Sequence, residues 1–291
     1  MPAVTELRQP SGTAFTIRDL PWTEVAAIAR EGEALGFDTV FLPEITGTRD
    51  ALATLVAIAG ETEALRLGTG VIPMGSRTSK LAAMAAATVQ ERSGGRLVLG
   101  VGTGGSAPGA LDRLRTYVAE LREHLSSTPL PLGAPVPVWI AALGPRAVRL
   151  AGEIADGVIL NWCTPDRVAE ARDAIRTSAG AAGRDPDAVT ISVYVRAAFS
   201  DRADEALHAA AAEYASYPSY ARQFEAMGVE PTADAVVETV CLRGDAVGAR
   251  DRLEAYRAAG ADLPVVYPVL APGETAAASI ATLTALAPDV A

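Results

Sequence analysis

The stretch VPVWIAALGPRAVRLAGEIADGVILNW, residues 136–162, contains two short apolar runs on either side of one helix-like segment. The runs Val136–Ala141 and Gly157–Asn161 have the length and composition of buried strands. Between them, Pro145–Ile154 begins with a proline, which is favoured in the first turn of a helix. Two strands that are joined by one helix lie parallel in a sheet, so this stretch predicts a β-α-β unit.

The same alternation of strands and helices continues towards both ends of the chain. Six more strands are expected, at Thr13–Arg18, Phe37–Pro43, Leu65–Ile72, Arg96–Val101, Val189–Phe199 and Leu263–Leu270. Helices are expected at Leu20–Gly36, Thr48–Glu61, Ser79–Arg92, Gly109–Leu125, Asp166–Ala181 and Glu274–Leu286. A longer helical region is expected from Asp201 to about Arg257, with breaks at Gly228, Pro231 and Gly244.

Eight strand–helix units with almost wholly apolar strands indicate a parallel sheet that helices cover on the outside. Eight such units favour closure into a barrel, and 291 residues suit a fold that typically takes about 250. No low-complexity linker divides the chain. The sequence therefore predicts an α/β protein, a single (β/α)8 TIM barrel in one domain over residues 1–291.

Composition narrows the classes of partner. A net charge of −10 disfavours nucleic acid, because phosphate binding needs clustered Lys and Arg. The sequence has no apolar run long enough for a membrane span, and its first residues lack a secretion signal, so a cytoplasmic enzyme is expected. Two cysteines and two histidines leave little material for a metal site, and none is predicted.

Active sites of such barrels lie at the carboxyl ends of the strands, which yields a short set of candidates. The run Gly100–Gly105 (GVGTGG) satisfies the G-x-G-x-x-G pattern of a dinucleotide site, but it follows the fourth strand and lacks the expected later acid. Its glycines suit either a tight turn or the close approach of a flat ring or phosphate. Ala141–Arg146 ends the fifth strand and starts a helix, which suits an anion or a simple capping turn. The ionisable candidates at the strand ends are Glu44, Arg77, Arg146 and Arg196.

Taken together, these segments resemble the luciferase-like monooxygenase superfamily, and most of all its members that use the deazaflavin coenzyme F420. The resemblance covers nearly the whole chain. Its most specific part is residues 136–162, quoted above. Supporting segments are ALGFDTVFLPE (Ala34–Glu44), LRLGTGVIP (Leu65–Pro73), GGRLVLGVGTG (Gly94–Gly104) and AAGADLPVVYPV (Ala258–Val269).

The resemblance implies that the mouth of the barrel holds the ring, with a non-proline cis peptide behind it at Gly70-Val71. It implies that Glu44 stands where many relatives carry a histidine, and that Gly105 replaces an acid found in some deazaflavin relatives. It also implies a shortened connection between the fourth and fifth strands, and a homodimer. The predicted cofactor-binding residues are Gly70, Val71, Thr103, Gly104, Gly105, Ala141, Ala142, Leu143, Gly144 and Arg146.

The leading hypothesis is an oxidoreductase that transfers a hydride between coenzyme F420 and a small organic substrate. Glu44 is the candidate catalytic residue. The structural alternative is that it is an exposed loop carboxylate or a partner for Arg49. The candidate substrate-facing residues are Asn161, Cys163, Tyr194 and Arg196, although Cys163 is more typical of an inert thiol than of a participant. An FMN-dependent monooxygenase and a non-catalytic barrel of the same family are the alternatives.

Overall fold

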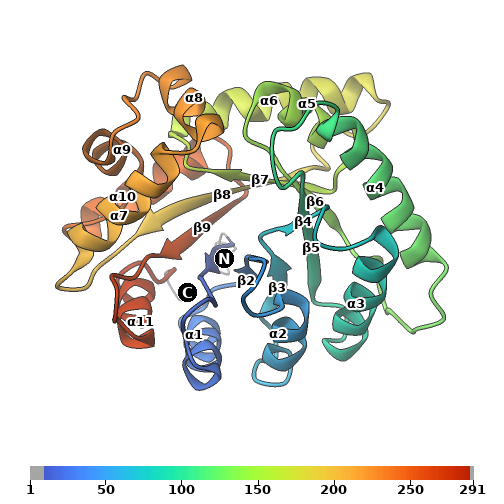
Figure 1. The fold of residues 1–291 in the computed structure, drawn as a ribbon, viewed down its shortest axis with the longest axis horizontal. Helices are drawn as coiled ribbons and strands as arrows, with labels where there is room; N and C mark the ends of the chain where they lie inside the picture. The colour runs from blue at the N-terminus through green and yellow to red at the C-terminus, as the bar shows by residue number, and fades with distance from the viewer. Residues whose placement is uncertain (1–9, 289–291) are drawn as a thin grey trace, which may run out of the picture.

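A computed structural model describes residues 10–288, and within them every strand pairing is parallel. The strands follow the order β3-β2-β1-β9-β8-β7-β6-β5-β4, and an additional pairing of β3 with β5 closes the sheet into a barrel. Helices surround this barrel on the outside (Figure 1). The strands are β1 (Gly12–Ala14), β2 (Thr39–Leu42), β3 (Arg66–Thr69), β4 (Ile72–Pro73), β5 (Leu97–Gly102), β6 (Val138–Ala141), β7 (Gly157–Asn161), β8 (Thr190–Ala197) and β9 (Leu263–Pro268).

This arrangement confirms the predicted barrel, since β3 and β4 are two pieces of the single strand expected at Leu65–Ile72. The first strand is shorter than expected, because its pairing with β2 ends at Ala14 opposite Phe41. The connection from β5 to β6 holds one helix and a loop, as expected for a shortened connection. The one-domain organisation of residues 1–291 stays a prediction, because residues 1–9 and 289–291 lie outside the described part.

The helices agree with the predicted ranges to within a few residues, except in the region Asp201–Arg257. This region forms four helices, and the sequence analysis missed the break at Ser216–Tyr217. Pro218 explains this break, because proline cannot continue one helix but is well suited to start the next. The helices are α1 (Trp22–Ala34), α2 (Ala51–Ile58), α3 (Ser79–Arg92), α4 (Ala110–Ser126), α5 (Pro145–Ile154), α6 (Pro165–Ala181), α7 (Ala203–Ala215), α8 (Pro218–Ala226), α9 (Ala233–Val240), α10 (Ala246–Ala258) and α11 (Ala276–Ala285).

The interior of the barrel is filled by side chains that point inwards from most of its strands. Glycines on neighbouring strands make room for the large rings among them. A Cβ atom at Gly157 would lie 2.4 Å from the Trp139 ring, and one at Gly68 would lie 2.2 Å from the Phe41 ring. The lumen cluster comprises Ala14, Phe41, Val98, Trp139, Ile159, Tyr194, Leu263 and Val265.

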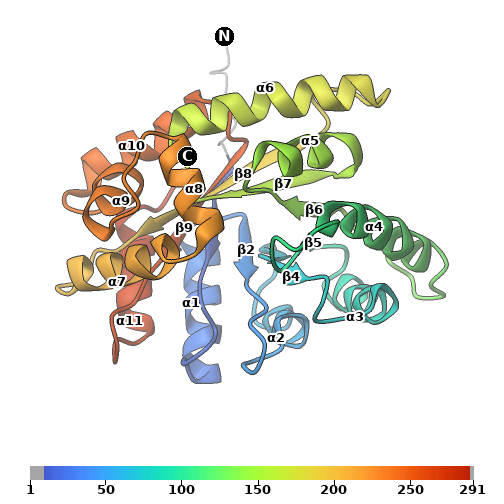
Figure 2. The same ribbon diagram turned by 45° about the horizontal axis from the view of Figure 1, so that its top comes forward.

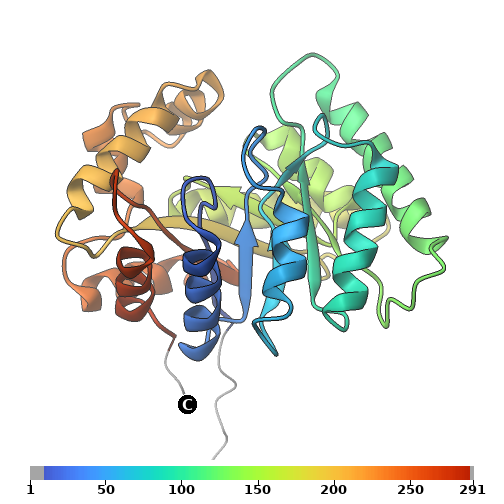
Figure 3. The same cartoon turned by 60° about the horizontal axis from the view of Figure 1, so that its bottom comes forward.

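The segment α7–α10 is inserted between β8 and β9 (Figure 2). It supplies most of a second hydrophobic cluster. Figure 3 shows the arrow of β2 pointing towards the end of the barrel beside which α7 and α8, gold to orange, rise. Trp162 at the end of β7 joins this cluster, together with Leu207 of α7 and Phe224 of α8. The insertion therefore stands at the end of the barrel where active sites of this fold lie. Among residues 10–288 no helix is long and apolar enough to cross a membrane.

Candidate active site at the barrel mouth

Strand alternation determines which residues form the last inward layer at the mouth. On β8, Tyr194 belongs to the lumen cluster, so Arg196, two residues further on, also points inwards. By the same rule Asn161 follows Ile159 on β7, and Tyr267 follows Val265 on β9. The half of the mouth that β7, β8 and β9 build is therefore polar and aromatic.

The opposite half of the mouth is built from small residues. Gly102 ends β5 and Ala141 ends β6, and a Cβ atom at Gly102 would lie 3.4 Å from that of Ala141. The same Cβ atom would lie 3.0 Å from Cγ2 of Val71. The three residues thus stand side by side and form a wall with little relief, which a flat molecule can approach closely.

The Gly70-Val71 peptide bond is cis, at the position that the family resemblance implied. Gly70 also has a steric role that the sequence analysis missed. A Cβ atom there would lie 1.9 Å from Oη of Tyr194 and 3.2 Å from Cβ of Phe41. Tyr194 therefore reaches across the barrel until its hydroxyl touches the backbone at Gly70.

Exposed backbone continues the small-residue wall into two loops. Thr103 is half-buried, and Gly104 and Gly105 are exposed in the loop after β5, where Gly104 has a φ of +69°. A Cβ atom would meet no neighbour within 4 Å at Gly105 or at Gly144. These positions leave the main chain open to a ligand.

The N-terminus of α5 adds unsatisfied donors at the same end of the barrel. Gly144 precedes the helix, and no side chain caps its first turn, which contains Arg146. The structure thus brings together the predicted cofactor residues, with one restriction at Ala142. Its N–H donates to the carbonyl of Ile159, because the residue continues the sheet.

Glu44 follows β2 and lies in an ion-pair network beside the mouth. Its side chain is 8% exposed, and both of its carboxylate oxygens accept hydrogen bonds from Arg77, at 2.8 Å from Nε and 2.7 Å from Nη2. Ser76 Oγ donates a further bond of 2.8 Å, and Asp50 pairs with the same guanidinium. The hydrogen bond to Glu44 raises the pKa of Arg77 above its ordinary value.

The alternative that paired Glu44 with Arg49 is wrong. Arg49 donates to the carbonyls of Ile17 and Leu20 instead, at 3.4 and 3.0 Å. Arg77 takes its place as the partner of Glu44, because the loop after β4 lies against the loop after β2. Arg77 was among the ionisable residues singled out at the strand ends, but the sequence did not show which acid it would meet.

Arg196 is the most unusual charged group at the mouth, because it is only 3% exposed and has no carboxylate partner within residues 10–288. Its Nη1 donates to Oδ1 of Asn161 at 2.8 Å, and its Nη2 makes a long bond of 3.4 Å to the hydroxyl of Tyr214. Its guanidinium carbon lies 3.9 Å from the ring centre of Tyr267 and 4.8 Å from that of Trp162. Three aromatic rings, counting Tyr214 at 5.3 Å, therefore surround this cation.

Cys163 is the one predicted substrate-facing residue that the structure does not bring to the lumen. It is 3% exposed, lies in the cluster between strands and helices, and donates through Sγ to the carbonyl of Asn161. Burial raises the pKa of its thiol to about 12. Because β7 ends at Asn161, the side chain two residues later no longer follows the inward alternation, and the inert-thiol interpretation fits its surroundings.

The α7–α8 insertion supplies residues that the sequence analysis missed altogether. Tyr220 accepts a bond of 2.9 Å from Nδ2 of Asn161, and Gln223 donates to the carbonyls of Asn161 and Trp162, both at 2.8 Å. The spacing of Tyr214, Tyr217 and Tyr220 was the available signal, because residues three apart share one side of a helical segment.

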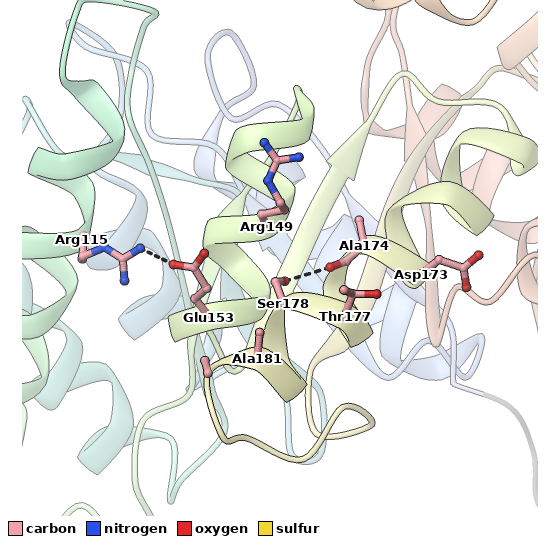
Figure 4. A pocket seen from close by; sticks show the side chains of 9 residues that line it. Arg115, Arg149, Glu153, Asp173, Ala174, Thr177, Ser178 and Ala181 are labelled. Atoms are coloured by element: carbon pink, nitrogen blue, oxygen red, sulfur yellow. Dashed lines mark hydrogen bonds and ion pairs between the residues drawn. The ribbon is translucent and has the colours of Figure 1, made fainter.

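An open groove of about 770 Å³ lies elsewhere, between α4, α5 and α6 (Figure 4). Arg115 and Glu153 form an ion pair in this groove. Its α6 lining, from Asp173 to Ala182, belongs to the second half of that helix and the residue after it. Helices of this fold run back along the strands, so the groove lies away from the mouth.

Three comparisons place these features among known proteins. The family model of luciferase-like monooxygenases matches residues 5–125 and 109–263. A segment of 116 residues is 34% identical to a 5,10-methylenetetrahydromethanopterin reductase of Methanolobus tindarius. This match covers 38% of the chain and 34% of that reductase, so the chain matches only about a third of the relative's length.

Two solved structures share the whole fold. An F420-dependent secondary alcohol dehydrogenase, in complex with an F420-acetone adduct, has a TM-score of 0.78 at 19% identity and covers 96% of this chain and 99% of its own. The oxygenating component of 3,6-diketocamphane monooxygenase of Pseudomonas putida, in complex with FMN, has a TM-score of 0.72 at 15% identity and covers 97% of both chains. Because the family model spans most of the barrel, the chain belongs to the luciferase-like monooxygenase family.

Proposed function

We propose that the protein is an oxidoreductase that transfers a hydride between coenzyme F420 and a small organic substrate. The observation that carries this proposal is the division of the mouth into a wall of small residues and a polar, aromatic half. One half suits a flat ring and the other half suits the molecule that reacts with it. The fold shared with the F420-dependent secondary alcohol dehydrogenase supports the deazaflavin as the ring.

The residues on the small side fit such a cofactor. Val71, Gly102 and Ala141 would support the ring, because they form a wall on which no large side chain intervenes. The uncapped N-terminus of α5, with Arg146 in its first turn, would hold a phosphate through backbone N–H groups. The other contributors would be the exposed backbone at Thr103, Gly104, Gly105, Leu143 and Gly144, and the carbonyl of Ala142.

When bound, the deazaflavin would supply the redox chemistry. The protein would bind and orient the cofactor and the substrate, and would exclude water from them. Asn161, Tyr194 and Arg196 would contact the substrate from the polar half. Glu44 would hold or accept the proton that accompanies the reaction. Hydrogen bonds from Arg77 and Ser76 hold its carboxylate in place beside the mouth.

An FMN-dependent monooxygenase is the second candidate, and the fold shared with the FMN complex of the camphane enzyme favours it. The small-residue wall accepts either ring, because the two cofactors differ little in the shape of the tricycle. The difference between them lies in the chemistry of the bound ring and in the tail beyond the phosphate.

The test is a fluorescence titration of the purified protein with coenzyme F420 and, in parallel, with FMN. We expect saturable binding of F420 and binding of FMN at least about tenfold weaker, which corresponds to about 1.4 kcal/mol of preference. Preference for FMN would transfer the assignment to the monooxygenase. Binding of neither would leave a barrel without cofactor, which contradicts both proposals.

A further inference from the structure

Arg196 is a buried cation whose surroundings only partly compensate its charge. A guanidinium carries more donors than its contacts with Asn161 and Tyr214 use, and its other N–H groups have no acceptor among residues 10–288. Removing a charged group from water is unfavourable unless the group is paired and hydrogen-bonded. The three rings around Arg196 attract its charge, but of their atoms only the hydroxyl oxygen of Tyr214 accepts a hydrogen bond from it.

A second observation is independent of the arginine. Buried polar side-chain atoms nearly always have a hydrogen-bond partner. Six such atoms within residues 10–288 lack one, and three of these belong to residues near Arg196 in the fold. They are Oη of Tyr194, which lies two residues earlier on β8, Nε1 of Trp162, whose ring faces the guanidinium, and Oε1 of Gln223, whose amide donates to the carbonyls of Asn161 and Trp162. Two of the three can donate. Together with the unused N–H groups of Arg196, they form a cluster with more donors than acceptors.

The backbone conformation of Trp162 is also unusual, as is common for residues in binding sites. It has a φ of +54°, a left-handed conformation that residues other than glycine rarely adopt. This turn places the indole under the guanidinium, with its ring centre 4.8 Å away. Asn161, Tyr267 and Tyr220 are only half-buried, so the cluster borders the mouth of the barrel.

We propose that Arg196, supported by the hydroxyl of Tyr194, binds a carboxylate of the substrate, which is a small, flat organic acid. The carboxylate supplies the missing negative charge and the missing acceptors in one group. The rings of Trp162, Tyr214 and Tyr267 supply flat apolar surroundings for the remainder of the molecule. This inference rests on the proposed function, because it places the acid opposite the wall that would support the ring.

The probe is benzoate, with benzamide as its neutral counterpart of the same shape, titrated calorimetrically into the full chain. We expect saturable binding of benzoate and at least about tenfold weaker binding of benzamide, because charge-assisted bonds to a guanidinium are lost. Equal affinities for the two probes, or no binding of benzoate, would overturn the inference. This comparison needs no substitution and therefore does not depend on whether a variant folds.

Two variants and one control then locate the site. Arg196→Gln is expected to weaken benzoate binding by about ten- to a hundredfold, and Tyr194→Phe by several-fold, since it removes only the unpartnered hydroxyl. Arg149→Gln, in the outer groove, is expected to leave the affinity unchanged. Unchanged benzoate binding in folded Arg196→Gln protein would contradict the assignment.

The cofactor titration distinguishes this inference from the proposed function. If F420 binds Arg196→Gln as tightly as the unaltered chain, the arginine serves the substrate and not the cofactor. If the substitution weakens F420 binding, or F420 displaces benzoate competitively, the cluster belongs to the cofactor and the inference fails. If benzoate binds but F420 does not, the carboxylate site stands and the cofactor proposal fails.

Discussion

Glu44 is the proposed proton acceptor, and it also forms a nearly buried ion pair with Arg77. Replacing it with glutamine keeps the shape of the side chain and removes the charge. We expect Glu44→Gln to lower kcat by about 10²–10⁴-fold with little change in KM, which is the usual contribution of a positioned acid or base. Steady-state turnover with reduced cofactor, together with a thermal melt of each protein, measures this effect.

The matched control is Asp50→Asn, because Asp50 pairs with the same Arg77 but is 45% exposed. Asparagine retains the N-cap that Asp50 provides to Ala53 in α2. This variant is expected to keep most of the turnover. Loss of stability without loss of kcat in Glu44→Gln would show that the carboxylate is structural.

The sequence allowed single residues to be predicted only where backbone geometry decides their role. Gly70 and Gly104 could be identified because a flat ligand or a positive φ favours glycine there. The partner of Glu44 could not, since Arg77 lies 33 residues away and meets it only after two loops pack together. The ring cluster around Arg196 was missed for the same reason, as Tyr214 comes from the helical insertion.

At the scale of elements, α1 is tied to the start of β3 by a single carboxylate. Both oxygens of Glu33 accept a bond from Glu63 N–H, and Oε1 also accepts bonds from Ala64 and Leu65 at 2.7 and 2.8 Å. Burial by itself raises the pKa of Glu33, but the bonds from Ala64, Leu65 and Glu63 outweigh it, so the pKa lies below the ordinary value. We therefore expect Glu33→Gln to reduce the free energy of unfolding by about 1–2 kcal/mol at neutral pH.

The pH dependence of this loss has a definite sign. A folded-state pKa below the unfolded value of about 4.3 means that the stabilisation is present above that pH and is lost as the pH falls through the folded value. Urea unfolding at about pH 7 and about pH 3.5 should show a smaller difference between the two proteins at the acid pH. Glu31→Gln, on the same helix, is the control, because its side chain makes no hydrogen bond among the described residues. A difference for Glu33→Gln that does not shrink in acid would contradict this explanation.

Most elements could be predicted because the strands of a closed parallel barrel are buried on both faces and therefore form short, almost wholly apolar runs in the sequence. Helices α3 and α5 agree with their predicted bounds, since Thr78 caps one and Pro145 starts the other. The break between α7 and α8 was harder to predict, because Ser216 and Tyr217 are acceptable in a helix and only Pro218 marks the interruption. The division of the third strand into β3 and β4 is likewise hidden in an unbroken run of strand-forming residues.

At the scale of the whole molecule, we propose that the homodimer implied by the family resemblance uses the outer face of α3. Leu81 and Met84 are 55% and 58% exposed there, although both are large apolar side chains. Light scattering after size exclusion should give a mass about twice the 30.0 kDa of the chain. Leu81→Glu combined with Met84→Glu should give a monomer, because a charge buried in an apolar interface has no partner.

Val247→Glu provides the control for this measurement. Val247 is 67% exposed on α10 and therefore tests whether any added surface charge has the same effect. The dimer should persist in this variant. A dimer that also persists in the α3 variant would place the interface on another face.

The insertion between β8 and β9 has one consequence for how the enzyme can change over time. A single uninterrupted stretch of the chain, from Ala198 to Asp262, contains α7–α10 and Tyr214, one of the three rings around Arg196. Because all members of its apolar cluster except Trp162 lie within this stretch, recombination at its two ends would exchange the helices that cover the polar half of the mouth as one unit. The strands would stay intact, so the cover over the proposed substrate could change without altering the residues that would hold the cofactor.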